Sequence, residues 1–141
     1  MVSTAYELAT AYDIGRKELI FCSADDTIRE VAKDLRSKDI GSMIVKSGDG
    51  YAGIITEDNI LHAISEGVNV LDKKVGEIEL DTLHTIKKNA TLSEVSNLFA
   101  STGTTRAGVV DEDGRIVAVV KKKNLELFDR FSFVDRAYHR R

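Results

Sequence analysis

Two places in the chain combine a polar or charged side chain with an asparagine three residues later. Thr56 and Asn59 form the first place, and Lys121 and Asn124 form the second. A threonine between a strand and a helix holds its hydroxyl beside free backbone N–H groups and the positive end of the helix dipole, which favour an anion. A residue three positions later lies within reach of a sugar attached to that anion. Both places are candidates for binding a phosphorylated ligand, although threonine and asparagine are also ordinary helix caps.

Three consecutive lysines, Lys121-Lys122-Lys123, begin the helix predicted at the second place. Cations at this end oppose the helix dipole, whereas Glu57-Asp58 at the first place follow the usual preference. Residues 121–141 contain seven basic and three acidic side chains, a net charge of +4, and the first 120 residues carry −7. We expect a phosphate chain near Lys121, with Arg106 on the neighbouring strand. An acidic partner surface, a nucleic acid and a solvated lysine run are the alternatives.

The other reactive residue types form no catalytic or metal-binding pattern. His62, His84 and His139 have no second histidine or cysteine at ligand spacing. Cys22 has no neighbouring base and is expected to be a small buried residue. No pair of carboxylates is arranged as acid and base. We therefore expect no metal, no catalytic residue and no enzymatic activity.

The composition is typical of a soluble domain with an ordinary hydrophobic core. The 141 residues (15.6 kDa) carry a net charge of −3, which argues against a general polyanion binder. The lone cysteine excludes an internal disulfide framework. No stretch approaches roughly 18 apolar residues, and the N-terminus lacks an export-signal pattern. We expect a cytoplasmic protein without a membrane segment.

The second half of the chain repeats the first. A shift of 64 residues superimposes apolar, acidic and capping positions, among them the Thr-x-x-Glu sequences that begin at Thr27 and Thr91. One extra residue near Gly103 changes the shift to 65, which aligns Val45 with Val110. Chance does not readily keep these three kinds of position in phase over a whole unit, so the architecture is that of two repeats.

Each repeat is predicted to fold as β-α-β-β-α, which gives an α+β fold. Thr27 and Thr91 cap the first helices through capping boxes. The predicted strands and second helices are Leu19–Ser23, Ser42–Lys46, Tyr51–Thr56 and Asn59–Ser65 in the first repeat, and Leu83–Ile86, Ala107–Val110, Arg115–Val120 and Asn124 onward in the second. Because neither half buries much surface alone, we expect the halves to pack about a pseudo-twofold axis.

Helices are also predicted at both ends of the chain. Ser3–Tyr12 has Thr4 and Glu7 at capping-box spacing, with Leu8 and Tyr12 on one side, and the C-terminal helix carries an apolar stripe of Phe128, Phe131, Val134 and Tyr138. The stripe packs either on its own chain or on a partner subunit. We assign residues 1–68 to the N-terminal helix and first repeat, and residues 69–141 to the second repeat and C-terminal helix.

The hairpin of the first repeat resembles a known family. Gly41-Ser42-Met43-Ile44-Val45, followed by Gly53-Ile54-Ile55-Thr56-Glu57-Asp58-Asn59-Ile60-Leu61, is similar to the cystathionine-β-synthase-type (CBS) domain, which commonly ends in Gly-Ile-Val-Thr-x-x-Asp-Ile-Leu. Ala118 to Leu125 resembles a more divergent copy. The resemblance covers roughly residues 11–130. It implies a tandem CBS module whose two clefts bind AMP, ADP, ATP or S-adenosylmethionine in many members.

The resemblance also implies roles for individual residues. In the family the threonine meets phosphate, the aspartate binds ribose, and the strand before the hairpin contacts the base. The matching positions of the first cleft are Thr56, Asn59, and Ser42, Met43 and Ile44; those of the second are Lys121, Asn124, and Arg106, Ala107 and Gly108. Asparagine replaces the aspartate in both copies. The replacement loses a charge-assisted hydrogen bond, about 1 kcal/mol, and a neutral helix cap explains the same asparagines.

Three functions are compatible with these features. The first is a homodimeric, energy-sensing regulatory module that binds an adenine nucleotide and signals to an unidentified effector protein. The second is a ligand-free dimeric interaction scaffold. The third is a nucleic-acid-binding variant that uses the basic C-terminal segment.

Overall fold

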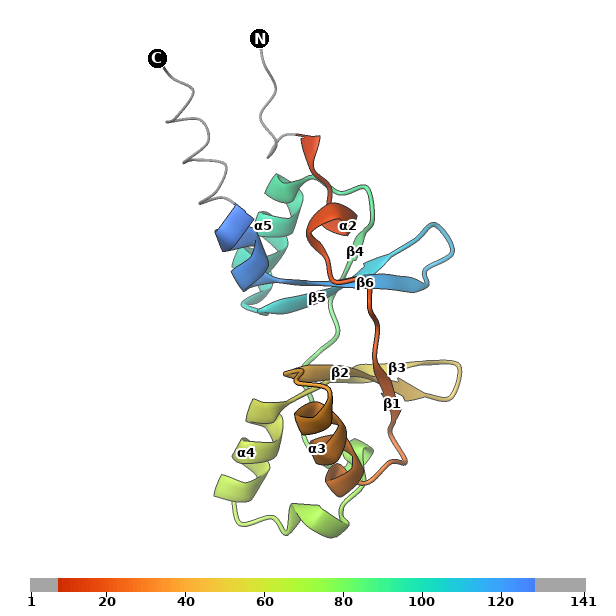
Figure 1. The fold of residues 1–141 in the computed structure, drawn as a ribbon, viewed down its shortest axis with the longest axis vertical. Helices are drawn as coiled ribbons and strands as arrows, with labels where there is room; N and C mark the ends of the chain where they lie inside the picture. Colours follow the sequence, from red (N-terminus) through yellow and green to blue (C-terminus); the bar gives the residue numbers. More distant parts are fainter. Residues whose placement is uncertain (1–7, 129–141) are drawn as a thin grey trace. The chain divides into compact units, whose positions relative to one another are not determined.

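The computed structural model describes residues 8–128, which divide into two compact units (Figure 1). The central unit comprises residues 19–83, and the terminal unit comprises the described residues on either side, 8–18 and 84–128. Each unit contains one three-stranded sheet and its own hydrophobic core. The predicted α+β class with two repeats is confirmed.

The central unit has the predicted order of elements. Its elements are β1 (Phe21–Ser23), α3 (Ile28–Ser37), β2 (Ser42–Ser47), β3 (Gly50–Thr56), α4 (Glu57–Ser65) and two short 3-10 helices, η1 (Val70–Asp72) and η2 (Val75–Glu77). Strand β2 lies between a parallel β1 and an antiparallel β3. Helices α3 and α4 lie on the same side of this sheet (Figure 1).

The start of α3 explains how the sequence places the core. Thr27 accepts a hydrogen bond from the backbone N–H of Glu30 (3.1 Å), and the Glu30 carboxylate accepts one from the N–H of Thr27 (3.4 Å). The apolar stripe that follows, Ile28, Val31 and Leu35, is buried against the sheet. The box fixes the first turn, and the stripe fixes the buried side of the helix.

The terminal unit repeats this topology. Its elements are α2 (Ala11–Ile14), β4 (Thr85–Lys87), α5 (Leu92–Thr102), β5 (Arg106–Val110), β6 (Ile116–Lys121) and a helix at 122–128. Strand β5 lies between a parallel β4 and an antiparallel β6. Leu92, Val95 and Phe99 of α5 are buried in its core.

The N-terminal segment differs from the sequence prediction. Residues 3–7 of the helix predicted over Ser3–Tyr12 lie outside the described residues. Tyr12 lies in a separate helix, α2, which begins after Thr10 with a capping box to Asp13. Leu8 is 70% exposed, and Ala11 is fully buried, with its N–H bonded to the Ala90 carbonyl (2.9 Å). This segment therefore belongs to the compact unit that contains the second repeat, and the two units divide at 18/19 and 83/84.

The strand registers also correct the position of the extra residue. Ser42 pairs with Thr56, and Arg106 pairs with Lys121. Counting along the strands from these pairs, Val45 corresponds to Val109 and not to Val110, and the additional residue lies in the β5–β6 turn rather than near Gly103. A longer turn is accommodated at a hairpin tip without disturbing the ladder.

In each unit a short segment adds to the edge of the last strand. Arg16 and Val119 exchange two backbone hydrogen bonds (2.8 and 2.9 Å), and Asp81 and Ile54 exchange two (both 3.0 Å). Val119 lies two residues before the end of β6, and Ile54 lies two residues before the end of β3. Arg16 and Asp81 are therefore structural equivalents, each beside the junction between the last strand and the following helix.

Little of the predicted C-terminal stripe falls within the described residues. Phe128 packs against the terminal core, whereas Phe131, Val134 and Tyr138 lie outside the described residues. Between residues 8 and 128, no helix has the length and apolar character needed to cross a membrane.

We predict that Gly53→Ala destabilises the central unit. Gly53 has φ of +152°, and an added Cβ would lie 2.6 Å from the Asp81 carbonyl oxygen, so the substitution must disrupt the Ile54–Asp81 bridge. A loss of about 1–3 kcal/mol is expected in urea denaturation. Gly50→Ala in the same strand is the control, because its nearest contact is 4.0 Å away. Equal effects of the two substitutions would contradict the prediction.

Candidate functional site

The first predicted site lies where β3 ends and α4 begins. Thr56 is 3% exposed, and its hydroxyl accepts a hydrogen bond from the Asn59 N–H (3.2 Å). The Asn59 side-chain oxygen accepts in turn from the Thr56 N–H (2.8 Å). The two residues form a reciprocal capping box, so the capping role considered for both is present here.

A carboxylate that the sequence analysis missed completes this site. The Asn59 side-chain amide donates a hydrogen bond to Oδ1 of Asp81 (3.0 Å), which the bridge to Ile54 holds in place. Asp81 lies 22 residues from Asn59 in the chain. No local pattern could reveal this contact, because it depends on a backbone pairing between distant segments.

The other three residues predicted for the first site are divided between the faces of the sheet. Met43 belongs to the core cluster on the helix side. Ser42 and Ile44, its neighbours along β2, have side chains on the opposite face because side chains alternate along a strand. The structure therefore places Ser42 opposite Thr56 and buries Met43 in the core.

The second predicted site is strongly basic. Arg106 and Lys121 are directly opposite each other on β5 and β6, and both are half-buried. Burial, and then the positive charges of Arg106, Arg16 and Lys123, lower the pKa of Lys121 from its usual value. Nε of Arg106 is buried and has no hydrogen-bond acceptor among the described residues. The sequence analysis found Arg106 and Lys121 but missed Arg16.

The remaining residues of the second site have different surroundings. Ala107 is in the core, and Gly108 is buried on the face that Arg106 shares. Asn124 is half-buried in the helix at 122–128. Lys121 stands where the first site has Thr56, and its side chain has no oxygen to cap this helix.

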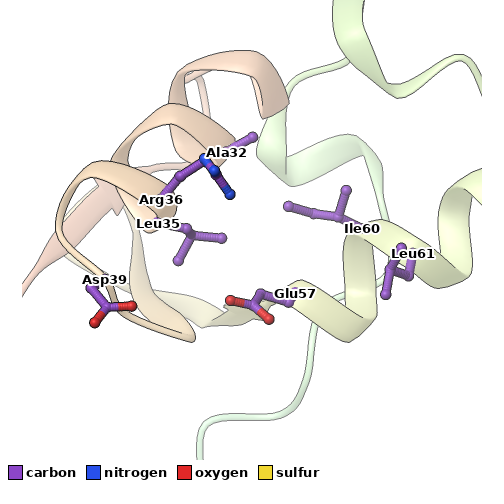
Figure 2. Close-up of a pocket in the computed structure, with 7 residues that line it drawn as sticks. All are labelled: Ala32, Leu35, Arg36, Asp39, Glu57, Ile60 and Leu61. Atoms are coloured by element: carbon purple, nitrogen blue, oxygen red, sulfur yellow. The ribbon is translucent and has the colours of Figure 1, made fainter.

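A groove of about 630 Å³ lies between α3 and α4 (Figure 2), and no residue predicted for either site lines it. It is lined by Ala32, Leu35, Arg36, Asp39, Glu57, Ile60 and Leu61. Apolar side chains and charged side chains of both signs line it. The sequence analysis did not predict a groove there.

Two further observations concern reactive groups. Cys22 is buried, and burial, followed by the nearby Asp26 and Asp34, raises its pKa to about 11. A thiol in this state is a poor nucleophile. Within residues 8–128, no three histidine, cysteine or acidic residues gather as metal ligands.

Comparisons with known proteins agree with the repeat. The CBS domain family profile matches residues 11–66 and 75–126. An uncharacterised protein of Methanopyrus kandleri is 28% identical over 115 residues, which cover 80% of this chain and 59% of that relative, so the chain spans about three fifths of that relative's length.

Solved structures share the fold over most of the chain. An uncharacterised conserved protein of Pyrococcus horikoshii matches with a TM-score of 0.76 and 25% identity, covering 88% of this chain and 94% of that one. Hypoxic Response Protein I, a curated relative from Mycobacterium tuberculosis whose crystal structure has two coordinated zinc ions, matches with a TM-score of 0.69 and 22% identity. That match covers 85% of this chain and 98% of the other.

We predict that Asn59→Asp destabilises the central unit by about 1 kcal/mol, because a second carboxylate would face Asp81 where an amide now donates a hydrogen bond. The double variant Asn59→Asp/Asp81→Asn should recover most of this loss. Urea denaturation of the single and double variants measures the coupling. Additive effects would show that the two side chains do not interact.

We also predict that Cys22 reacts slowly with a disulfide reagent such as Ellman's reagent. A pKa of about 11 in place of 9.0 lowers the thiolate fraction roughly 100-fold at pH 8. The reaction should accelerate to the rate of a free thiol when urea unfolds the protein. A rapid stoichiometric reaction of the folded protein would be inconsistent with the buried thiol.

Proposed function

Because the chain belongs to the CBS-domain family and carries two copies of the domain, we propose that it is a non-catalytic regulatory module that binds an adenine nucleotide. The proposed ligand is AMP, ADP, ATP or S-adenosylmethionine. The proposed output is a signal to a separate effector protein in the cytoplasm. Because the proposed ligand is an adenine nucleotide, the proposed biological role is energy sensing.

One observation carries this proposal. In both units the residues at the implied phosphate positions, Thr56 and Lys121, end the last strand and directly precede a helix. Each is opposite a residue implied to face the base, Ser42 or Arg106. A strand end beside a helix start offers backbone donors and a favourable dipole to an anionic group.

A nucleotide can regulate such a module only by binding one conformation more tightly than another. The strand–helix junctions are suitable for this because each joins segments that are distant in sequence. In the central unit, Asn59 contacts both Thr56 and Asp81; in the terminal unit, Lys121 is opposite Arg106. A ligand that bridges these groups would stabilise one arrangement of the junction.

Self-association is part of the proposal. Leu61 and Ile64 on α4 are 62% and 51% exposed, which favours burial against another subunit. A hexameric CBS-CP12 protein from bloom-forming cyanobacteria shares the fold with a TM-score of 0.72 and 21% identity. We propose a homodimer as the basic assembly.

A ligand-free dimeric scaffold is the second candidate. It is favoured by the Thr56, Asn59 and Asp81 hydrogen bonds, which satisfy these side chains without a ligand. The two candidates differ in whether any nucleotide binds, whereas both include a dimer.

We predict that isothermal titration calorimetry detects saturable binding of at least one of AMP, ADP, ATP and S-adenosylmethionine, with a dissociation constant below about 1 mM. Ribose 5-phosphate is the control for the contribution of adenine and should bind more weakly. If no adenosine compound gives heat or raises the melting temperature at millimolar concentration, the scaffold is the better explanation. Sedimentation equilibrium should then still show the dimer.

A further inference from the structure

Three cationic side chains from distant segments meet on one face of the terminal sheet. Arg106 is directly opposite Lys121 in the β5–β6 ladder. Arg16 is directly opposite Val119, two residues before Lys121 and on the same face of β6. All three are half-buried. We call Arg16, Arg106 and Lys121 the basic cluster.

The basic cluster is electrostatically unfavourable without a counter-charge. Like charges directly opposite each other on neighbouring strands repel, and partial burial weakens screening by water. Lys121 responds with a lowered pKa, whereas arginine remains charged. Arg16 forms an ion pair with Glu18 at 3.7 Å, and the Glu18 side chain is 78% exposed. Among the described residues, no carboxylate forms an ion pair with Arg106 or Lys121.

Arg106 supplies a second and independent observation. Its Nε is buried and bonds to no acceptor within residues 8–128. A buried donor on a charged group is costly when it has no partner. An oxygen of a bound anion would satisfy this donor and neutralise the repulsion at the same time.

The equivalent place in the central unit has the opposite character. Ser42 and Thr56 stand where the terminal unit has Arg106 and Lys121, and Asp81 stands where it has Arg16. Asn59 already donates to the Asp81 carboxylate there. A fixed carboxylate repels phosphate. The same backbone arrangement therefore carries neutral and acidic side chains in the central unit and basic side chains in the terminal unit.

We propose that the basic cluster of the terminal unit is a binding subsite for two or more linked phosphates, and that the equivalent place in the central unit does not take them. Three positive charges exceed the negative charge of one phosphate monoester. Because the three side chains come from separate segments, they can contact different phosphates of one chain. This inference rests on the proposed nucleotide binding and narrows its ligand to a nucleoside diphosphate or triphosphate, at one phosphate-chain subsite per chain.

The test compares ATP, AMP and inorganic tripolyphosphate by calorimetry on the wild-type protein and on Arg16→Gln, Arg106→Gln and Lys121→Gln. ATP and tripolyphosphate should bind at one site per chain, and ATP should bind at least tenfold more tightly than AMP. Each substitution should weaken ATP and tripolyphosphate about tenfold or more, because it removes a charge-assisted contact. Lys88→Gln is the matched control: this exposed lysine of the same unit should have no effect.

Thermal denaturation without ligand separates a binding role from a structural one. If the cluster is an anion subsite, Lys121→Gln relieves repulsion, so the melting temperature at low salt should rise or stay unchanged. It should also lose most of the stabilisation that tripolyphosphate gives the wild type. A lower melting temperature with an unchanged tripolyphosphate effect would overturn the inference, because the cluster would then be structural.

The possible outcomes distinguish this inference from the proposed function. If AMP binds as tightly as ATP and the three substitutions have no effect, the inference is overturned and nucleotide binding stands. If tripolyphosphate binds in a cluster-dependent way but no adenosine compound binds more tightly, the inference stands and the adenine proposal fails. Failure of every ligand to bind overturns both. Cluster-dependent binding of single-stranded RNA without binding of tripolyphosphate overturns the inference.

Discussion

The backbone bridge between a flanking segment and the last strand is the constraint on which both sites depend. Arg16 with Val119, and Asp81 with Ile54, form the same two-bond pairing in the two units. The bridge fixes where the side chain of the flanking residue stands without specifying what it is, because only its peptide group takes part. In the central unit the close approach at Gly53 adds a steric condition. The repeat could therefore change its chemistry at this position while its fold stayed the same.

The two strand–helix junctions show how far that change has gone. In the central unit a neutral capping box begins α4, Glu57 and Asp58 suit the helix dipole, and Asn59 joins the box to Asp81. In the terminal unit Lys121 replaces the capping threonine, and the helix begins with two more lysines against its dipole. The preferences for a capping side chain and for acidic residues at the helix start are both met in the central unit and both violated in the terminal unit. Such concentrated violations are expected at functional sites, where binding offsets the cost in stability.

Sequence reasoning predicted the first helix of the first repeat from neighbouring residues alone. The box at Thr27 and the buried stripe after it follow from spacings of three and four residues, and the structure has both. The prediction that Tyr12 ends the N-terminal helix was wrong. Thr10 and Asp13 form a capping box that begins α2, and the hydrogen bond from Ala11 to Ala90 holds the start of α2 in place. Asp81 and Arg16 were missed for a related reason: each enters its site through a pairing with a distant strand, which no periodicity in the sequence encodes.

The difference between the units also bears on which of them would drive a regulatory change. A ligand shifts a conformational equilibrium only through its unequal affinity for the two states, and groups that are already satisfied add little to that difference. The polar groups of the central junction are bonded to one another. The terminal junction holds opposed cations and a buried guanidinium nitrogen that has no acceptor within residues 8–128. An anion would therefore release more free energy in the terminal unit. Its contacts would tie β5, β6 and the segment at Arg16 together, and that segment leads within five residues into β1 of the central unit. The covalent chain thus connects the basic cluster directly to the other repeat.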